Sequence, residues 1–258
     1  MDRSSKNLVK FCRKEHNILN GAPIRIGTLH EYRQIENPEI KDEDEGKYTF
    51  TIEFPEEITL DRRWSNLLFQ GFFGAGCIEE LPRLPGKTTV HNESFGIVRQ
   101  FGENLTIRDT KLRIEREFPD CFIFCMSLMT KVENPFAGYD DKWMVPYCKI
   151  DEFTRALASR FIKKIQPFYF EESIAEFFAP KNKDSLNLMI RDREVIYVER
   201  NMVITESNRP SYESLFNTLA NIPFTKPSIF KPEKEYRFLF ELNNGEKVFQ
   251  PAVKSFLM

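Results

Sequence analysis

The sequence predicts an α+β fold with mixed, mainly antiparallel strands and a few flanking helices. Strand-like segments, either alternating or wholly apolar, outnumber the segments with helical spacing of apolar residues. The helical segments do not alternate regularly with the strands, as they would in a parallel βαβ protein. The 258 residues are 41% hydrophobic, which is enough for a packed core, and we expect a single domain spanning residues 1–258.

The N-terminal part predicts a short helix and two strands. Asn7–His16 has apolar residues at helical spacing and predicts an amphipathic helix. Residues 23–29 and 47–54 alternate in polarity and predict strands. The turn-rich segment 36–46 between them predicts a loop, and its acidic run Asp42–Gly46 is expected to be solvent-exposed.

The middle of the chain predicts further strands. Residues 67–76 are apolar and interrupted by glycines, which indicates a buried bend. Residues 95–117 have the alternation of a β meander with three short strands. Residues 121–128 are almost wholly apolar, as expected of a central strand that is buried on both faces.

Two amphipathic helices follow. Asp151 is placed to cap a helix whose apolar residues are four apart, namely Phe153, Leu157, Phe161 and Ile165. Ser211 is placed to cap a second helix, which carries Leu215, Phe216 and Leu219.

The remaining C-terminal elements are predicted strands. Residues 194–199, 235–242 and 247–253 each have strand character, and the last two are separated by an Asn-Asn-Gly turn.

Charge and cysteine content narrow the class of protein. The net charge of −2 provides no global attraction to nucleic acid or to an anionic membrane. The chain shows no targeting or membrane segment, and its five scattered cysteines suit reduced thiols. Cys121 and Cys125 are four apart, but none of the three histidines has metal-ligand spacing, so no metal is expected. These features predict a cytoplasmic protein without membrane association.

The segment 224–240, FTKPSIFKPEKEYRFLF, has the most informative charge pattern. If it is one strand, alternation places Glu233, Glu235 and Arg237 on one face and apolar aromatic residues on the other. The charged row is then either a half-solvated strand face with an ion pair or part of a functional site.

A Glu-x-Glu pair that opens a strand resembles the catalytic signature of the ADP-ribosyltransferase superfamily, in its Arg-Ser-Glu class. The resemblance implies a split sheet around a cleft, with NAD as the substrate. Glu235 would stabilise the oxocarbenium-like transition state as nicotinamide leaves, and Glu233 would orient the acceptor. Arg237 would keep Glu235 ionised.

The same resemblance implies further cofactor-binding residues. Arg25 lies on an early predicted strand and would bind the NAD phosphates, since guanidinium forms a planar fork of donors. Ser127 would brace the ribose region, although Cys125 stands where the family usually has the first Ser of a Ser-Thr-Ser triplet. Alternatively, His30 and Tyr32 resemble the His-Tyr-Glu class, in which His binds the adenosine side and Tyr stacks on nicotinamide.

Short segments also resemble an uncharacterised bacterial family with a terminal E-x-E-x-R strand. These segments are IRIGTLHEYR, FCMS, YDDKW and KPEKEYRF. In YDDKW, Tyr139 or Trp143 would stack on nicotinamide or on a target base. The alternative is an ordinary polar turn in which Trp143 fills the edge of the core.

Together these patterns lead us to expect an NAD-dependent mono-ADP-ribosyltransferase. Its acceptor would be a protein or a nucleic acid, and by analogy it would be a bacterial or phage toxin or antiviral-defence enzyme with a possible antitoxin or regulator. Two alternatives remain. The charged row belongs to a non-catalytic binding or sensor module, or the four carboxylates hold Mg²⁺ in a nuclease, namely Asp140, Asp141, Glu233 and Glu235.

Overall fold

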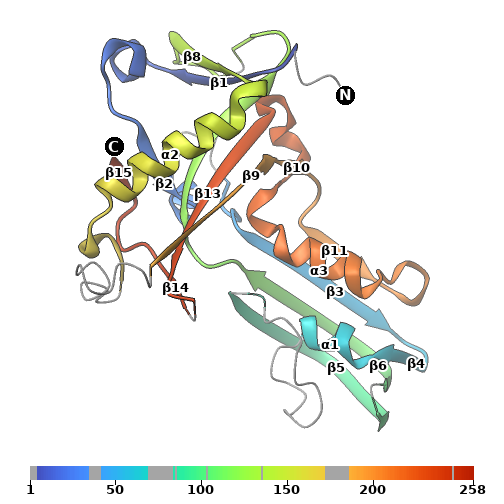
Figure 1. Ribbon diagram of the computed structural model, residues 1–258. Helices are drawn as coiled ribbons and strands as arrows, with labels where there is room; N and C mark the ends of the chain where they lie inside the picture. Colours follow the sequence, from blue (N-terminus) through green and yellow to red (C-terminus); the bar gives the residue numbers. More distant parts are fainter. Residues whose placement is uncertain are drawn as a thin grey trace. The chain divides into compact units, whose positions relative to one another are not determined.

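The computed structural model of the chain confirms the α+β fold with mainly antiparallel strands (Figure 1). It describes residues 5–34, 42–68, 84, 86–102, 104–134, 136–171, 186–245 and 247–258. The chain divides into two compact units. The first comprises Met1–Glu45, Asp120–Tyr197 and Lys226–Met258, and the second comprises Gly46–Pro119 and Val198–Thr225. The expected organisation as a single domain stays a prediction.

The first unit contains an antiparallel sheet. Its central path runs in the order β13 (Glu235–Asn243), β7 (Phe122–Met129), β1 (Asn7–Cys12) and β8 (Asp141–Pro146). The other paired strands are β9 (Asn187–Glu194) and β14 (Val248–Phe249) on β13, and β2 (Arg25–Thr28), which pairs with both β7 and β15 (Ser255–Leu257).

The sheet splits along one edge of β7. On that edge β1 pairs with the end of β7 as far as Ser127, whereas β2 pairs with its beginning at Phe122 and Ile123. Phe124–Met126 therefore have no strand partner on this edge in the described part of the chain. The other edge of β7 pairs with β13 without interruption.

Helix α2 (Ile150–Lys164) covers one face of this sheet (Figure 1). Leu157 and Phe161 are buried against apolar side chains of β7 and β13, and the Phe161 ring stacks on Phe240 with centroids 4.8 Å apart. The predicted apolar stripe is thus confirmed, although the helix begins at Ile150 and Asp151 lies in its first turn. The even-numbered residues of β7 face α2, which leaves Cys125 and Ser127 on the opposite face.

The predictions for the segments that form β1 and β8 are wrong. Asn7–His16 is not a helix but strand β1 followed by the 3₁₀ helix η2 (Lys14–His16). Leu8 and Val9 are both fully buried because β1 lies between β7 and β8. A strand with apolar residues on both faces can have apolar residues at the spacing of a helix, which explains the wrong prediction. The YDDKW segment is not a turn, since β8 begins at Asp141.

The C-terminal strands also differ from the expected bounds. The predicted strand 194–199 is the end of β9 followed by the two-residue strand β10 (Ile196–Tyr197). Of residues 247–253 only Val248–Phe249 form a strand. Further short 3₁₀ helices among the described residues of this unit are η3 (Ile18–Asn20), η4 (His30–Gln34), η5 (Tyr147–Lys149), η6 (Pro167–Tyr169) and η11 (Ser228–Glu233).

In its described residues, the second unit is a five-stranded sheet with two α-helices. Its strands are β3 (Lys47–Phe54), β4 (Ile58–Asp61), β5 (Lys87–Phe101), β6 (Asn104–Glu117) and β11 (Asn201–Ile204), and β11 runs parallel to β3. The helices are α1 (Arg62–Leu68) and α3 (Tyr212–Ala220), with η9 (Glu206–Asn208) and η10 (Ile222–Phe224). The chain returns to the first unit within β12 (Thr225–Lys226).

Some predictions for this second unit are confirmed and one is wrong. Strand β3 has the predicted bounds, and Ser211 caps α3 by accepting a hydrogen bond from the Ser214 amide. The predicted meander is instead one long hairpin of β5 and β6. The two predicted strands on either side of residue 110 are a single strand, β6, whose pairing with β5 continues past this point. The predicted bend at 67–76 lies outside the described residues beyond Leu68.

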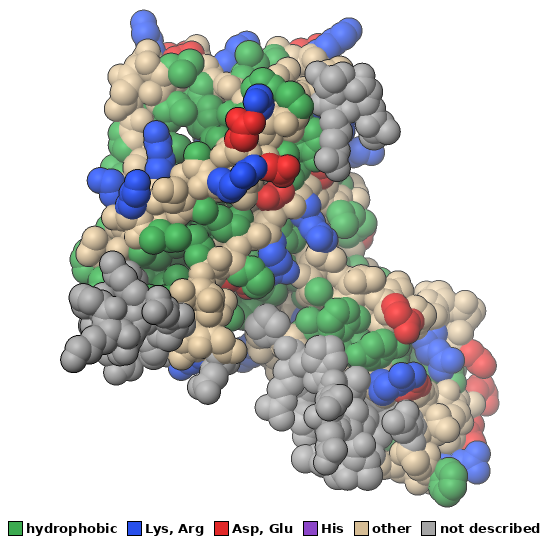
Figure 2. Space-filling model, in the orientation of Figure 1, with side chains coloured by type: hydrophobic (Ala, Val, Ile, Leu, Met, Phe, Trp, Pro, Cys, Tyr) green, Lys and Arg blue, Asp and Glu red, His purple; other side chains and the backbone are tan. Residues whose placement is uncertain are grey.

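Two properties of the described residues bear on association with membranes or with charged partners. In the described ranges, no helix is long and apolar enough to cross a membrane. On the side of the first unit seen in Figure 2, basic and acidic side chains are interspersed among apolar ones, in keeping with the net charge of −2.

Candidate active site

A sharp turn brings Glu233 and Glu235 together. Glu233 ends the 3₁₀ helix η11, Lys234 adopts the left-handed conformation with φ of 47°, and β13 begins at Glu235. The expectation that Glu233 and Glu235 share a strand face is therefore wrong. They converge nonetheless, because the Lys226 ammonium lies 2.7 Å from Glu233 Oε2 and 3.0 Å from Glu235 Oε2.

Glu235 is a buried carboxylate with two cationic partners. It is 6% exposed, and Arg237 Nε donates to its Oε1 at 2.7 Å while Lys226 pairs with the other oxygen. The Tyr197 hydroxyl accepts a hydrogen bond from the Glu235 amide at 2.7 Å. Burial alone would raise the pKa of Glu235, but Arg237 and Lys226 outweigh it and hold the pKa well below its usual range. Glu235 is thus a buried carboxylate that stays ionised at neutral pH.

Arg237 is held by a second carboxylate. It is 0% exposed, and its terminal nitrogens donate to the two oxygens of Glu45 at 2.8 and 2.9 Å. Glu45 belongs to the acidic run Asp42–Gly46, for which we expect solvent exposure. This expectation is confirmed for Glu43 and Asp44 but is wrong for Asp42 and Glu45, which are both buried. The bidentate pair fixes the Arg237 guanidinium, and with it the position of the Glu235 side chain.

Glu233 differs from Glu235 in its protonation. Burial, only partly offset by Lys226, raises the pKa of Glu233 to about 7, and the nearby Glu235 carboxylate also raises it. Lys226 binds its Oε2, whereas its Oε1 is buried and has no hydrogen-bond partner among the described residues. Two neighbouring carboxylates with such different pKa values are the pattern of an electrostatic stabiliser beside an acid or base.

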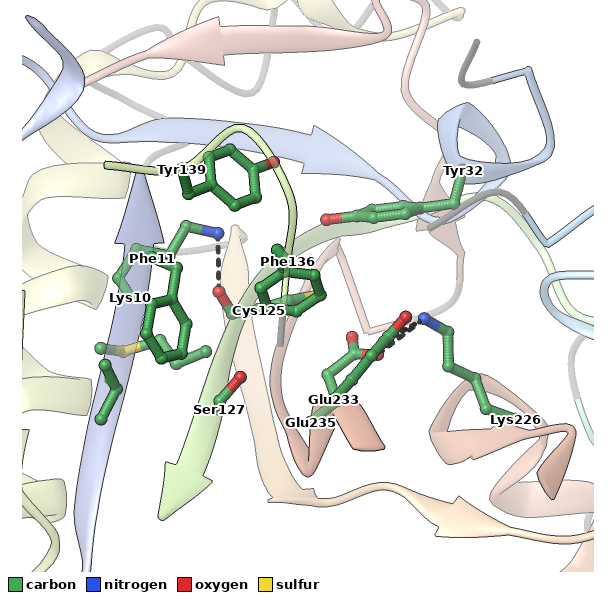
Figure 3. Close-up of a pocket in the computed structure, with 12 residues that line it drawn as sticks. Lys10, Phe11, Tyr32, Cys125, Ser127, Phe136, Tyr139, Lys226, Glu233 and Glu235 are labelled. Carbon is green, nitrogen blue, oxygen red and sulfur yellow. Dashed lines mark hydrogen bonds and ion pairs between the residues drawn. The ribbon is translucent and has the colours of Figure 1, made fainter. Parts of the chain in front are cut away.

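These carboxylates line a cavity on the sheet face opposite α2 (Figure 3). Ser127 lies directly across from Glu235 in the pairing of β7 with β13, and its hydroxyl faces the same space. The side chains of Tyr32, Phe136 and Tyr139 approach from other segments. The full lining comprises Val9, Lys10, Phe11, Tyr32, Cys125, Met126, Ser127, Phe136, Tyr139, Lys226, Glu233 and Glu235.

A second, larger cavity of about 310 Å³ adjoins the first at the split of the sheet. The two share part of their lining, namely Lys10, Phe11, Tyr32, Cys125 and Tyr139. The larger cavity is also lined by basic residues and by aromatic ones, namely Arg13, His16, Arg25, Phe124 and Trp143. It thus combines positive charge with ring surfaces, which suits a ligand that carries both phosphate and a base.

The structure brings most of the predicted site residues together. The smaller cavity takes Glu233, Glu235 and Ser127, the larger one takes Arg25 and Trp143, and Tyr32 and Tyr139 line both. His30 lines neither, and its backbone amide donates to Asp120 Oδ1 at 2.8 Å.

Trp143 is mainly a core residue. It is 4% exposed, and its ring stacks on Phe124 at a centroid distance of 6.2 Å. This position favours the interpretation in which Trp143 fills the edge of the core over one in which it stacks on a ligand.

The proposed magnesium ligands do not meet. Asp140 accepts a hydrogen bond from the Lys14 amide and Asp141 from the Asn17 side chain, and neither lines the cavity that holds Glu233. Across the ranges that the structure describes, no group of three His, Cys, Asp or Glu side chains is arranged to hold a metal ion.

Lys10, Glu45 and Lys226 are site residues that the sequence patterns did not identify. Lys226 stands among apolar residues in the segment FTKPSIF, which is a signal for a buried, paired lysine. Lys10 follows two apolar residues in a segment that the sequence predicts to be a helix. Glu45 has no local sequence signal for burial, because its partner Arg237 is 192 residues away.

Comparisons with family models, with curated proteins and with solved structures found no match to this chain. The geometry of the site is therefore the basis on which a function can be inferred.

Proposed function

We propose that the chain is an NAD-dependent mono-ADP-ribosyltransferase that modifies a protein or nucleic-acid acceptor. The observation that carries this proposal is the pairing of Glu235 with Ser127 across two adjacent strands, in a cavity that adjoins a larger basic and aromatic one. A dinucleotide needs such a pair of connected sites, one for the reacting ribose and one for the phosphates and the second base.

Glu235 supplies the charge that the transition state needs. When the bond between nicotinamide and ribose C1′ breaks, its electron pair leaves with nicotinamide and positive charge develops on the ribose. A fixed carboxylate in a site with little water stabilises this charge without reorganising. The two cations around Glu235 keep it ionised, and Ser127 is close enough in the strand pairing to bind the ribose beside it.

Glu233 serves the acceptor. Glu233 lines the cavity, and its Oε1 has no hydrogen-bond partner in the described part of the chain, so this oxygen can take the proton of a nucleophile that reaches it. The nucleophile forms a bond to C1′ and gives its proton to Glu233, whose pKa of about 7 suits a general base near neutral pH.

The proposal is tested by incubating the wild-type protein with NAD labelled in the adenosine portion, with and without lysate of a host cell. We expect nicotinamide release and transfer of the label to a macromolecule, and digestion with protease or nuclease identifies the acceptor class. If NAD is not consumed in either case, the transferase proposal is wrong. Cleavage of nucleic acid that needs a divalent metal but not NAD would indicate the nuclease instead.

The pH dependence of transfer tests the role of Glu233. Since burial raises its pKa to about 7, Glu233 is protonated below that pH and cannot accept the proton of the nucleophile. We expect the transfer rate to increase about tenfold per pH unit below 7 and to level off above it. The Glu233→Gln variant should lose this dependence, whereas Glu194→Gln, at an exposed position on β9, should keep it. An unchanged profile in Glu233→Gln would exclude Glu233 as the base.

A further inference from the structure

Lys10 occupies the split in the sheet. Pairing of β1 with β7 ends at Val9 and Ser127, and in the space beyond, Lys10 Nζ donates to the carbonyl oxygen of Cys125 at 2.8 Å (Figure 3). The ammonium also lies 5.1 Å from the centroid of the Phe124 ring. Lys10 lines both cavities, so its charge lies where they meet.

The charge of Lys10 is only partly compensated. In the part of the chain that the structure describes, no carboxylate forms an ion pair with it, and its contacts are one carbonyl and one ring. Burial lowers the pKa of the Lys10 ammonium, which shows that the surroundings disfavour its charge. An anion at the junction of the cavities would provide the missing partner, and two of the three ammonium donors remain for it.

Arg25, the other basic candidate, is already paired. It forms an ion pair with Glu31, and its side chain is 54% exposed. The Glu31 side chain lies directly over Gly27, where an added Cβ would be 2.7 Å from Glu31 Oε2. A phosphate bound to Arg25 would approach this carboxylate, so Arg25 is the weaker anion site of the two.

We propose that Lys10, rather than Arg25, is the principal anion-binding residue of the site and contacts the diphosphate of the dinucleotide where it passes from the larger cavity to the smaller. This inference rests on the proposed function. The aromatic lining of the larger cavity then faces the adenine side, and the ribose that reacts lies beside Glu235 and Ser127.

The test measures the affinity for ADP-ribose by calorimetry, since this probe carries the diphosphate but does not react. We expect Lys10→Met to weaken binding by about 10- to 100-fold, because a charge-assisted hydrogen bond in a shielded site is lost. Lys10→Arg should restore most of the affinity, and Arg25→Met should lose less than Lys10→Met. Lys142→Met is the matched control, because Lys142 is an exposed lysine on the adjacent strand β8 and lines neither cavity.

A second probe separates loss of the contact from loss of the fold. Adenosine lacks the diphosphate and should bind more weakly than ADP-ribose. Its affinity should be the same for Lys10→Met and for the wild type. Equal affinity of Lys10→Met and wild type for ADP-ribose, or a larger loss in Arg25→Met, would overturn the assignment of Lys10. If Lys10 governs ADP-ribose binding but the wild type releases no nicotinamide, the anion site stands and the transferase proposal falls. Failure of the wild type to bind ADP-ribose would overturn both.

Discussion

Glu235→Gln is expected to lower the rate of nicotinamide release from NAD by about 100- to 1,000-fold, the usual cost of removing one electrostatic stabiliser of a transition state. Glutamine has nearly the shape of glutamate, but it is neutral and cannot stabilise a cationic ribose. Binding in the ground state depends less on this charge, so the affinity for ADP-ribose should change by much less than the rate. The measurement is the initial rate of nicotinamide release at saturating NAD.

The matched control for this prediction is Glu194→Gln, a glutamate on the neighbouring strand β9 whose side chain is 57% exposed. It should leave the rate unchanged. Because Glu235 also balances the charges of Arg237 and Lys226, the unfolding of Glu235→Gln has to be followed at the assay temperature. A folded Glu235→Gln protein that retains the wild-type rate would show that Glu235 does not act in the reaction.

Arg237→Met is expected to lower the free energy of unfolding by about 3–5 kcal/mol, because removing one member of a buried ionic network leaves the others uncompensated. Arg237 is completely buried and contacts two buried carboxylates, Glu45 and Glu235. After the substitution both carboxylates would remain in the interior without the guanidinium that pairs with them. The measurement is urea unfolding at pH 7, compared with Arg160→Met on the exposed side of α2.

A double-mutant cycle isolates the pair of Arg237 and Glu45. If their bidentate contact accounts for much of the loss, Arg237→Met combined with Glu45→Gln should be less destabilised than the sum of the single variants. Additive effects would contradict a direct contribution of this pair. Loss of less than about 1 kcal/mol in Arg237→Met, the range of an exposed ion pair, would contradict the burial of the network.

The sequence patterns predicted the strands that carry the site more reliably than the surroundings of the site. The wholly apolar run at 121–128 and the alternating aromatic residues before 243 are local signals, and both mark central strands of the first unit. The strand β1 was mistaken for a helix because it is apolar on both faces. That property follows from its place between β7 and β8, which the sequence does not show locally.

The charged residues were identified as a group, but their geometry was not. The motif around Glu235 predicted an adjacent Arg237, and the structure adds Glu45 and Lys226 from distant segments. Strand alternation predicted that Glu233 lies beside Glu235, but for the wrong reason, since Glu233 ends a 3₁₀ helix and the left-handed Lys234 separates it from β13. A non-glycine residue with positive φ has no dependable sequence signal when it is lysine.

Several residues around Glu235 lie at the points where the chain passes between the two compact units. The chain passes between the two units at four points, and at three of them the residue of the first unit is Glu45, Tyr197 or Lys226. The first binds Arg237, the second accepts a hydrogen bond from the Glu235 amide, and the third pairs with the Glu235 carboxylate. Three of the four chain crossings thus lie at residues that contact Glu235 or its partner Arg237, so the segments that lead out of the first unit are fixed at its central carboxylate.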